Sequence, residues 1–301
     1  MRNRFQSHAL VIVIREFLFY QGRSWNFKMT ARPLQFNNDM LGLLQKVHIS
    51  IPCKTLDRYM EMILRHRMNL EIVFGASQLD EVPRPRLKTL ADQLHRNGIR
   101  VTFHGPFLDL CLGSIDSLIR QISKHRLQQC VDLFDIFQPI QMVCHTGYDP
   151  SHHRGLRDQW LKRSLAVWEE LLPQAEKLDV VLLMENVWEL DPLLHQETSR
   201  HLHSRYFGFC LDVGHQNCFS KTTLAQWVEA LGEGLMELHL HDNDGSGDAH
   251  LPVGQGNIDF PGLFQCLREK ERKPLLTLEP HTQEHLTESL GGLLRAMGAD
   301  P

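Results

Sequence analysis

The residues best suited to chemistry lie near the end of the chain, at residues 237–260, with the sequence ELHLHDNDGSGDAHLPVGQGNIDF. Apolar and polar residues alternate over residues 238–241, which predicts a strand with His239 and His241 on one face. An acidic, glycine-rich loop follows. Imidazoles and carboxylates at a strand end suggest a divalent metal site. The alternative is a buried, hydrogen-bonded His beside a solvated acidic turn, and this stretch alone does not decide between the two.

Similar polar residues stand where other predicted strands end. Six successive strand-like runs, from residues 99–107 to residues 275–280, each finish on a potential metal ligand. These ligands are His104, His145, Glu185, Asp212 with His215 beyond it, His239 and Glu279, and Asp248 and His250 follow in the loop after the seventh strand. One such residue is more often a hydrogen-bonded core or rim residue. Six strands that repeat the pattern at the same end favour a shared metal centre.

The elements that must position these residues are strands in alternation with helices. Two further strand-like runs, at residues 47–53 and 70–75, precede the other six, and helix-like runs separate them. Runs continuous in Val, Ile and Leu indicate a parallel sheet buried on both faces. The size of residues 47–301 matches a (β/α)8 TIM barrel of ~250 residues, so we predict one barrel domain there. A doubly wound open sheet is the alternative, but no G-x-G-x-x-G motif follows any strand.

Composition and charge limit the classes of partner. The 301 residues carry a formal net charge of −4, so no global positive charge points to a polyanionic partner. The seven Cys include no C-x-x-C pair, and several lie in apolar runs, which fits a reducing cytoplasm. No apolar run approaches the ~20 residues of a membrane span. We therefore expect a cytoplasmic protein without membrane contact, and an oligomer stays open.

The first 46 residues carry no motif and join the alternating pattern only at Val47. Charged residues interrupt the apolar run at residues 9–20, and no small-residue cleavage site follows it, so it resembles neither a signal peptide nor a membrane span. We expect a poorly ordered N-terminal extension over residues 1–46, with Met40 as an alternative start. An intact mass that matches the full length in natively expressed protein would contradict the alternative start.

Taken together, the motifs resemble the xylose-isomerase-like TIM barrels, a superfamily of sugar and sugar-phosphate isomerases and epimerases, related dehydratases and endonuclease IV. The matching motifs are HGPF at 104–107, MEN at 184–186, CLDVGH at 210–215, HLHDND at 239–244, DAHLPVGQGNIDF at 248–260 and LEPH at 278–281. They cover essentially everything from Val47 onward in the order and spacing of the superfamily. They do not single out one substrate.

The resemblance implies a set of metal ligands. The four that are typical of the epimerase branch are Glu185, Asp212, His239 and Glu279. The additional ligands that would complete the trinuclear cluster of the endonuclease branch are His104, His145, His215, Asp248 and His250. We expect one ion of Mn²⁺, Zn²⁺, Co²⁺ or Mg²⁺, and the larger set has room for up to three. In epimerases some of the additional positions contact substrate hydroxyls instead.

On this basis we expect a metal-dependent isomerase or epimerase of a sugar or sugar-phosphate-like polyhydroxy carbonyl compound, with a dehydratase as an alternative. Glu185 and Glu279 leave strands separated by two others, so they can flank a substrate; one removes a proton next to the carbonyl and the other returns it. The metal would chelate substrate oxygens and stabilise an enediolate. The candidate substrate contacts are His104, His215, His241 and Trp188. For His241 and Trp188 a packing role is an equal alternative.

An endonuclease acting on abasic DNA would use the same ligands on a phosphodiester, but it also requires a surface that attracts DNA. The loops at residues 185–191 and 241–248 are acidic, and the loop at residues 105–114 contains no base. A small sugar-like substrate is therefore favoured over nucleic acid, which stays the alternative. A binding protein without turnover would be expected to have lost ligands, and none is missing. The metal hypothesis fails if its four ligands do not converge on a common point.

Overall fold

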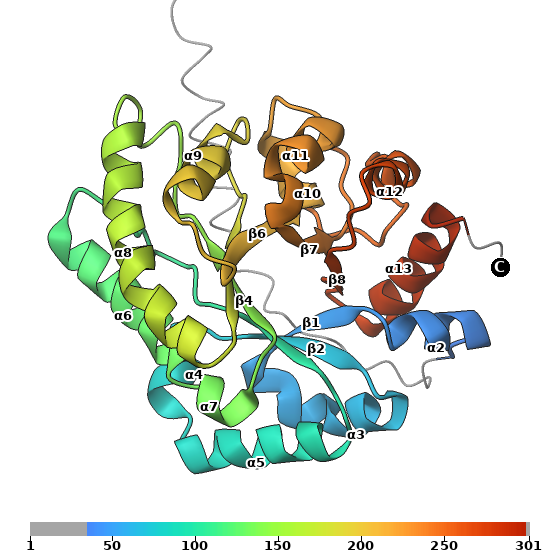
Figure 1. Ribbon diagram of the computed structural model, residues 1–301. Helices are drawn as coiled ribbons and strands as arrows, with labels where there is room; N and C mark the ends of the chain where they lie inside the picture. Colours follow the sequence, from blue (N-terminus) through green and yellow to red (C-terminus); the bar gives the residue numbers. More distant parts are fainter. Residues whose placement is uncertain (1–34, 299–301) are drawn as a thin grey trace, which may run out of the picture.

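Eight parallel strands close into a barrel in chain order, with β8 pairing back onto β1 (Figure 1). The computed structural model describes residues 35–298. The strands are β1 (His48–Pro52), β2 (Asn69–Val73), β3 (Val101–His104), β4 (Gln141–His145), β5 (Val181–Glu185), β6 (Phe207–Asp212), β7 (Leu235–Leu240) and β8 (Leu275–Leu278). Each overlaps its predicted run, and the predicted TIM barrel is confirmed.

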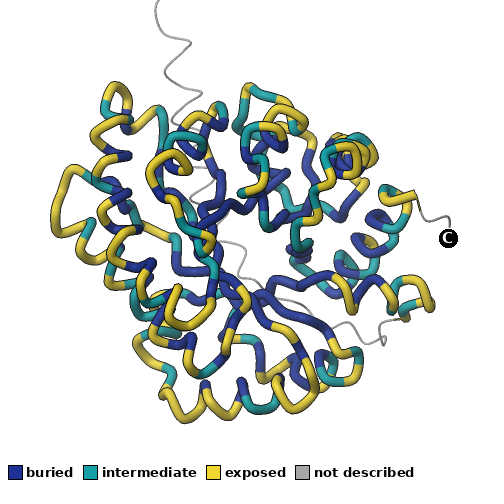
Figure 2. The backbone as a smooth tube through the Cα atoms, in the orientation of Figure 1, coloured by how far each residue is buried: buried dark blue, intermediate teal, exposed yellow. Residues whose placement is uncertain are grey.

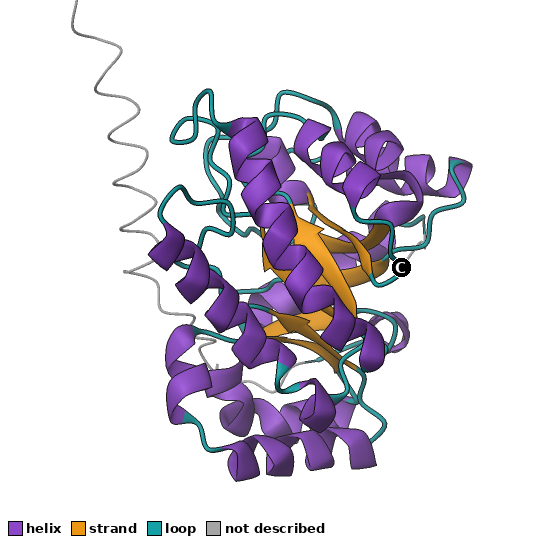
Figure 3. Ribbon diagram, turned by 60° about the vertical axis from the view of Figure 1, so that its left-hand side comes forward, coloured by secondary structure: helices purple, strands orange, loops and turns teal. Residues whose placement is uncertain are grey.

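Helices connect consecutive strands and enclose the barrel, as Figure 3 shows with helices in purple around the orange strands. The described helices are α2 (Asn38–Leu44), α3 (Leu56–His66), α4 (Ala76–Glu81), α5 (Arg84–Arg96), α6 (Ser117–Val131), α7 (Phe134–Phe137), α8 (Arg157–Lys177), α9 (Leu193–His201), α10 (Val213–Phe219), α11 (Leu224–Leu231), α12 (Phe260–Glu269) and α13 (Gln283–Ala296). None of them is long and apolar enough to cross a membrane.

Alternation along the strands separates an apolar outer face from a polar interior. In β7, Leu238 and Leu240 are buried beneath the helices, while Glu237 and His239 are buried inside the barrel. Figure 2 shows the same layering, with strands in dark blue and the outer sides of helices in yellow. Each fully buried Leu contributes about 1.5–3 kcal/mol to folding, so the layer between sheet and helices is the main source of stability.

Strand register sets the level at which the polar side chains meet. His145 pairs with Glu185 across β4 and β5, and Asp212 pairs with His239 across β6 and β7. Paired residues of parallel strands point to the same face, so these four side chains reach the interior near one end of the barrel. That end is the carboxyl end of the strands, where TIM barrels carry their active sites.

The N-terminal part of the fold begins before Val47. Residues 38–44, which were assigned to the extension, form α2, and this helix packs against α13 with Leu43 and Leu44 buried. Asn37 caps the helix by accepting a hydrogen bond from the backbone N–H of Met40 at 2.8 Å. The partner of this short helix lies at the other end of the chain, so local sequence pattern gave no sign of it. Residues 1–34 of the predicted extension lie outside the described residues.

Candidate metal centre at the mouth of the barrel

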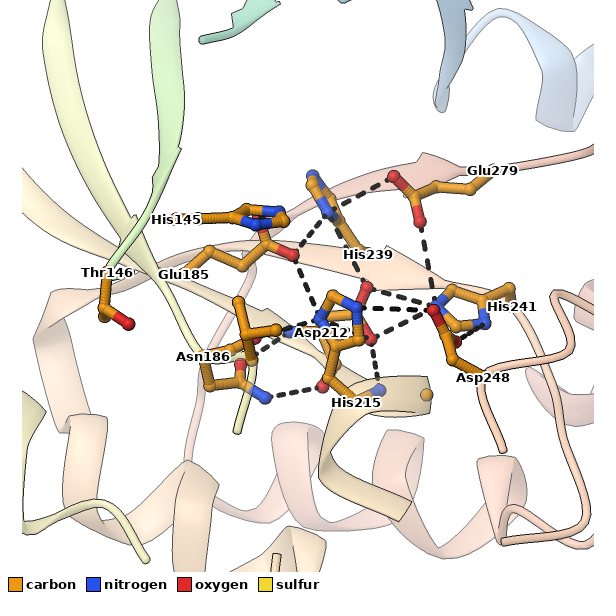
Figure 4. Close-up of polar contacts among 12 residues, drawn as sticks. His145, Thr146, Glu185, Asn186, Asp212, His215, His239, His241, Asp248 and Glu279 are labelled. Carbon is orange, nitrogen blue, oxygen red and sulfur yellow. Dashed lines mark hydrogen bonds and ion pairs between the residues drawn. The ribbon is translucent and has the colours of Figure 1, made fainter. Parts of the chain in front are cut away.

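Three carboxylates surround one ring nitrogen of His239 at the mouth of the barrel. Oxygens of Glu185, Glu279 and Asp212 lie 3.4, 3.5 and 3.8 Å from His239 Nδ1 (Figure 4). The side chains are buried, and that of Glu279 is the most exposed of the four at 8%. They come from β5, β6, β7 and the residue that follows β8, so the closed barrel brings them to one point. The four-ligand hypothesis required this convergence.

The spacing of these atoms suits a cation held between them. His239 Nδ1 is buried and makes no hydrogen bond to another described residue. Its distances to the carboxylates, 3.4–3.8 Å, are longer than those of charge-assisted hydrogen bonds. Ligand atoms ~2.1 Å from a tetrahedral ion lie roughly 3.4 Å from one another, which is close to the three distances from His239 Nδ1. Imidazole and carboxylate donors together suit a divalent transition metal.

Two further imidazoles close on the other oxygen of Glu185. Nε2 of His104 and Nε2 of His145 each lie 3.2 Å from Glu185 Oε2. His104 Nδ1 donates a hydrogen bond to the carbonyl oxygen of Gly105 at 2.8 Å, so its Nε2 is directed at the carboxylate. The ring of Phe107 stacks on His145 with centroids 4.5 Å apart. Both predicted additional ligands therefore lie beside the four.

A second group of ligand types lies next to the first, around Asp248. His241 Nδ1 lies 3.6 Å from Asp248 Oδ1, and His250 Nε2 lies 3.0 Å from Asp248 Oδ2. The rings of His241 and His250 stack with centroids 3.8 Å apart. His241 Nε2 lies 3.1 Å from Asp212 Oδ2, which joins the two groups. His241, a predicted substrate contact, is 1% exposed and has a carboxylate near each ring nitrogen, and it forms one of the groups that could hold a metal ion, together with His250 and Glu279.

Asp212 is the N-cap of helix α10, which carries His215 into the site. Asp212 Oδ1 accepts a hydrogen bond from the His215 backbone N–H at 2.6 Å, which caps the helix. The His215 ring then lies between the two groups, with Nδ1 3.3 Å from Glu185 Oε1 and Nε2 3.5 Å from Asp248 Oδ2. Asn186 joins the ends of β5 and β6 through two hydrogen bonds with the Asp212 backbone, at 2.8 and 2.9 Å. One capping interaction thus orients two predicted ligands.

Asp242 holds the loop that carries Asp248. Its Oδ2 accepts hydrogen bonds from the backbone N–H groups of Gly254 and Gly256, both at 2.9 Å. Gly254 has a φ of +85°, and a Cβ at Gly256 would lie 2.2 Å from the carbonyl oxygen of Asn243, so both positions need glycine. Asp242 was not among the predicted site residues. These hydrogen bonds tie the acidic loop to the end of β7 at the barrel mouth.

Opposite charges in the cluster shift the ionisation of its members. Burial raises the pKa of Glu185, but the surrounding imidazoles, His145 and His239 first, outweigh burial and hold that pKa well below its usual range. Burial lowers the pKa of His239, but the neighbouring Cys210, Glu71 and Glu279 raise it well above its usual range. A cation bound at Nδ1 would take the place of a proton there.

One residue inside the barrel contacts the cluster and was not among the predicted site residues. Glu71, in the middle of β2, has Oε2 3.1 Å from Nε2 of His239, and both side chains are fully buried. A single acidic residue within the apolar strand NLEIV was the only sequence signal of it. The predictions took residues from strand ends, so they omitted a contact made from the middle of a strand on the opposite side of the barrel.

Trp188 stands at the rim, on the turn after β5, and 39% of it is exposed. Its neighbour Glu189 is buried and anchors this turn, because the carboxylate accepts hydrogen bonds from the Val187 backbone N–H at 2.6 Å and from the Thr146 hydroxyl. Burial raises the pKa of Glu189 to about 7. Trp188 contributes no ligand atom to the cluster, and its predicted contact with substrate stays a prediction.

The sequence matches the family described as xylose isomerase-like TIM barrel over residues 59–297. The chain belongs to this family. Among curated relatives, an uncharacterized protein of Methanocaldococcus jannaschii is 26% identical over 237 residues, which are 75% of this chain and 79% of that protein. A second uncharacterized protein of the same organism is 22% identical over 183 residues, which are 60% of this chain and 71% of that protein.

Solved structures share the same barrel. A D-tagatose 3-epimerase-like protein aligns with a TM-score of 0.73 at 23% identity, covering 83% of this chain and 97% of that one. A Thermus thermophilus protein soaked with ZnCl2 aligns with a TM-score of 0.69 at 24% identity over 85% and 99%. A D-psicose 3-epimerase determined in the presence of D-fructose aligns at 0.67 and 14% identity over 84% and 100%. At these identities the likeness concerns the fold of this xylose isomerase-like barrel.

Proposed function

We propose that this barrel is a divalent-metal-dependent isomerase or epimerase of a sugar or sugar-phosphate-like polyhydroxy carbonyl compound. The observation that carries the proposal is the approach of Glu185, Asp212 and Glu279 to within 3.4–3.8 Å of His239 Nδ1. This arrangement supports a cation site with two glutamates beside the same imidazole nitrogen. The sugar epimerases among the structures with the same fold support the substrate class.

Glu185 and Glu279 are the proposed proton carriers, since both present Oε1 to the same point, 3.4 and 3.5 Å from His239 Nδ1. One removes the proton next to the substrate carbonyl and the other returns a proton to another face or a neighbouring carbon. Asp212 and His239 would hold the cation with them. When bound, the cation polarises the carbonyl and stabilises the negative charge that develops on its oxygen.

The remaining predicted substrate contacts lie around this point. His104 and His215 each approach Glu185, at 3.2 and 3.3 Å, so each can orient that carboxylate or meet a substrate hydroxyl beside it. Trp188 offers a partly exposed ring at the rim as an apolar wall for a sugar. These groups would position the substrate rather than exchange its protons.

A panel of ketoses and ketose phosphates, incubated with purified protein and Mn²⁺, Co²⁺, Zn²⁺ or Mg²⁺ in D₂O, tests the proposal. We expect ²H to enter one carbon next to the carbonyl of at least one substrate, and we expect Glu185→Gln and Glu279→Gln to lose this exchange. Glu237→Gln is the matched control, because Glu237 is a buried glutamate of the same barrel that contacts Gln141 and Thr277. Exchange that is absent from the whole panel, or unchanged in both site variants, would contradict the proposal.

A metal-dependent phosphodiesterase of the endonuclease IV type is the second candidate. The observation that favours it is the second ligand group, in which His215, His241 and His250 all approach Asp248. A duplex with one abasic site, nicked in a metal-dependent reaction without ²H exchange on the sugar panel, would establish this alternative. The number of bound ions also separates the two, since one per chain supports the epimerase and three support the nuclease.

A further inference from the structure

We propose that Glu71 is a positioning residue of the metal centre: it holds the proton of His239 on Nε2 and thereby directs an unprotonated Nδ1 at the cation. The inference rests on the function proposed above, because it takes His239 as a ligand. It adds a residue from β2, a strand whose end supplies no ligand atom to the described cluster. Glu71 is proposed to act through His239 and not as a ligand itself.

The contact is specific and closed to water. Glu71 Oε2 lies 3.1 Å from His239 Nε2, and neither side chain has any exposed surface. The two residues come from β2 and β7, which are not neighbours in the barrel, so the contact spans its interior. A carboxylate at this distance accepts a hydrogen bond from Nε2–H in the metal-bound state. The ring then has one lone pair left, on Nδ1, which faces the three other carboxylates.

The arrangement resembles the general pairing of a carboxylate with a metal-bound imidazole, in which the outer partner fixes the tautomer and the ring orientation. Here the outer partner, Glu71, has few other groups with which to form hydrogen bonds. Glu71 Oε1 makes no hydrogen bond to a described residue, and the hydroxyls of Ser50 and Thr102, its register neighbours on β1 and β3, are also unpaired. His239 is therefore the one described side chain that hydrogen-bonds this carboxylate, and losing the contact would leave the ring free to rotate.

The barrel provides a matched control in Glu237. It is buried to the same extent as Glu71 and sits on the strand of His239, two residues earlier, but its carboxylate binds Gln141 at 2.7 Å and Thr277 instead of the imidazole. Glu71→Gln and Glu237→Gln make the same replacement of a buried carboxyl group by an amide in the same interior. A general effect of this replacement would appear in both variants, and an effect transmitted through His239 would appear only in the first.

The test is the affinity for Zn²⁺ and Mn²⁺ of the full chain, measured by calorimetry or by competition with a chelating dye. Loss of an outer partner typically weakens metal binding about 10–100-fold, so we expect that loss for Glu71→Gln and an unchanged affinity for Glu237→Gln. If Glu71→Gln does not fold, as judged by circular dichroism, Glu71→Asp takes its place, because the shortened side chain withdraws the carboxylate from Nε2. Equal affinities in the wild type and the Glu71 variant would overturn the proposal.

His239→Ala separates this proposal from the function on which it depends. A weakened affinity in His239→Ala with no change in Glu71→Gln means that His239 is a ligand and that Glu71 does not position it. An unchanged affinity in His239→Ala removes His239 from the ligand set and contradicts both proposals. If both single variants weaken metal binding, and their effects are not additive in the double variant Glu71→Gln/His239→Ala, Glu71 acts on the metal through the ring of His239.

Discussion

Glu185 at the mouth of the barrel and Glu237 in its interior are both buried carboxylates, but their pKa values shift in opposite directions. At the mouth, burial raises the pKa of Glu185, but four imidazoles around it hold that pKa well below the usual range. In the interior, burial raises the pKa of Glu237 to about 7, and the nearby charge of Glu71 adds to the rise. Both side chains are almost fully removed from water. The neighbouring side chains therefore determine the direction of each pKa shift. Imidazoles keep Glu185 ionised, so that it can bind a cation, whereas the neutral donors Gln141 and Thr277 do not offset the burial of Glu237.

The largest expected effect is that of a substitution at the mouth, Glu185→Gln. Glu185→Gln removes a proposed proton carrier and the charge that four imidazoles face, so we expect kcat to fall by about 10²–10⁴-fold. Steady-state kinetics on the substrate found in the ketose panel measures the change. Glu237→Gln should keep kcat near the wild-type value. Normal activity in Glu185→Gln would mean that the carboxylates of the mouth and of the interior do not differ in their importance for catalysis.

The second prediction concerns the pH dependence of stability in the interior. The unfolded chain releases the Glu237 proton near pH 4.5, while the folded protein holds it up to about pH 7. Folding therefore loses stability as pH rises through this window, by at most roughly 3 kcal/mol. Glu237→Gln lacks that loss, so its free energy of unfolding should rise relative to wild type between pH 4.5 and 7. Urea unfolding at several pH values tests this, and parallel profiles would contradict it.

The third prediction concerns how much a cation bound at the mouth stabilises the folded protein. A ligand present at 100 times its Kd stabilises the folded state by about 2.7 kcal/mol, which corresponds to a Tm change of roughly 5–10 °C for a chain of this size. We expect a chelator to lower the Tm by that amount and added Zn²⁺ or Mn²⁺ to restore it. Asp212→Asn should show a much smaller response. A chelator shift of equal size in that variant would place the bound ion elsewhere.

The smallest expected effect lies at the rim, outside both buried regions. Trp188→Ala removes a ring that is 39% exposed, and we expect KM to rise about two- to tenfold with kcat nearly unchanged. The control is Leu178→Ala, an apolar residue of similar exposure, 36%, that follows α8. A fall in kcat without a change in KM would assign Trp188 to the chemistry of the mouth instead of to substrate binding.

Much of the site was predictable because it lies at strand ends. In a parallel barrel the carboxyl ends of all strands meet at one rim, so a ligand-type residue at each end of β3 to β8 predicts a cluster without any knowledge of packing. Oxygens of Glu185, Asp212 and Glu279 lie 3.4–3.8 Å from His239 Nδ1, and the shared metal site of these four residues stays a prediction.

Other features followed from contacts that local pattern does not encode. Glu71 reaches His239 from the far side of the barrel, α2 is buried against α13, and His241 faces Asp212 and Asp248. The amino-acid sequence by itself determined the barrel and the types of side chain at its mouth, because both depend on periodicity along single strands. Only the tertiary structure decided which oxygen faces which nitrogen, because those distances are set by closure of the barrel between strands far apart in the chain.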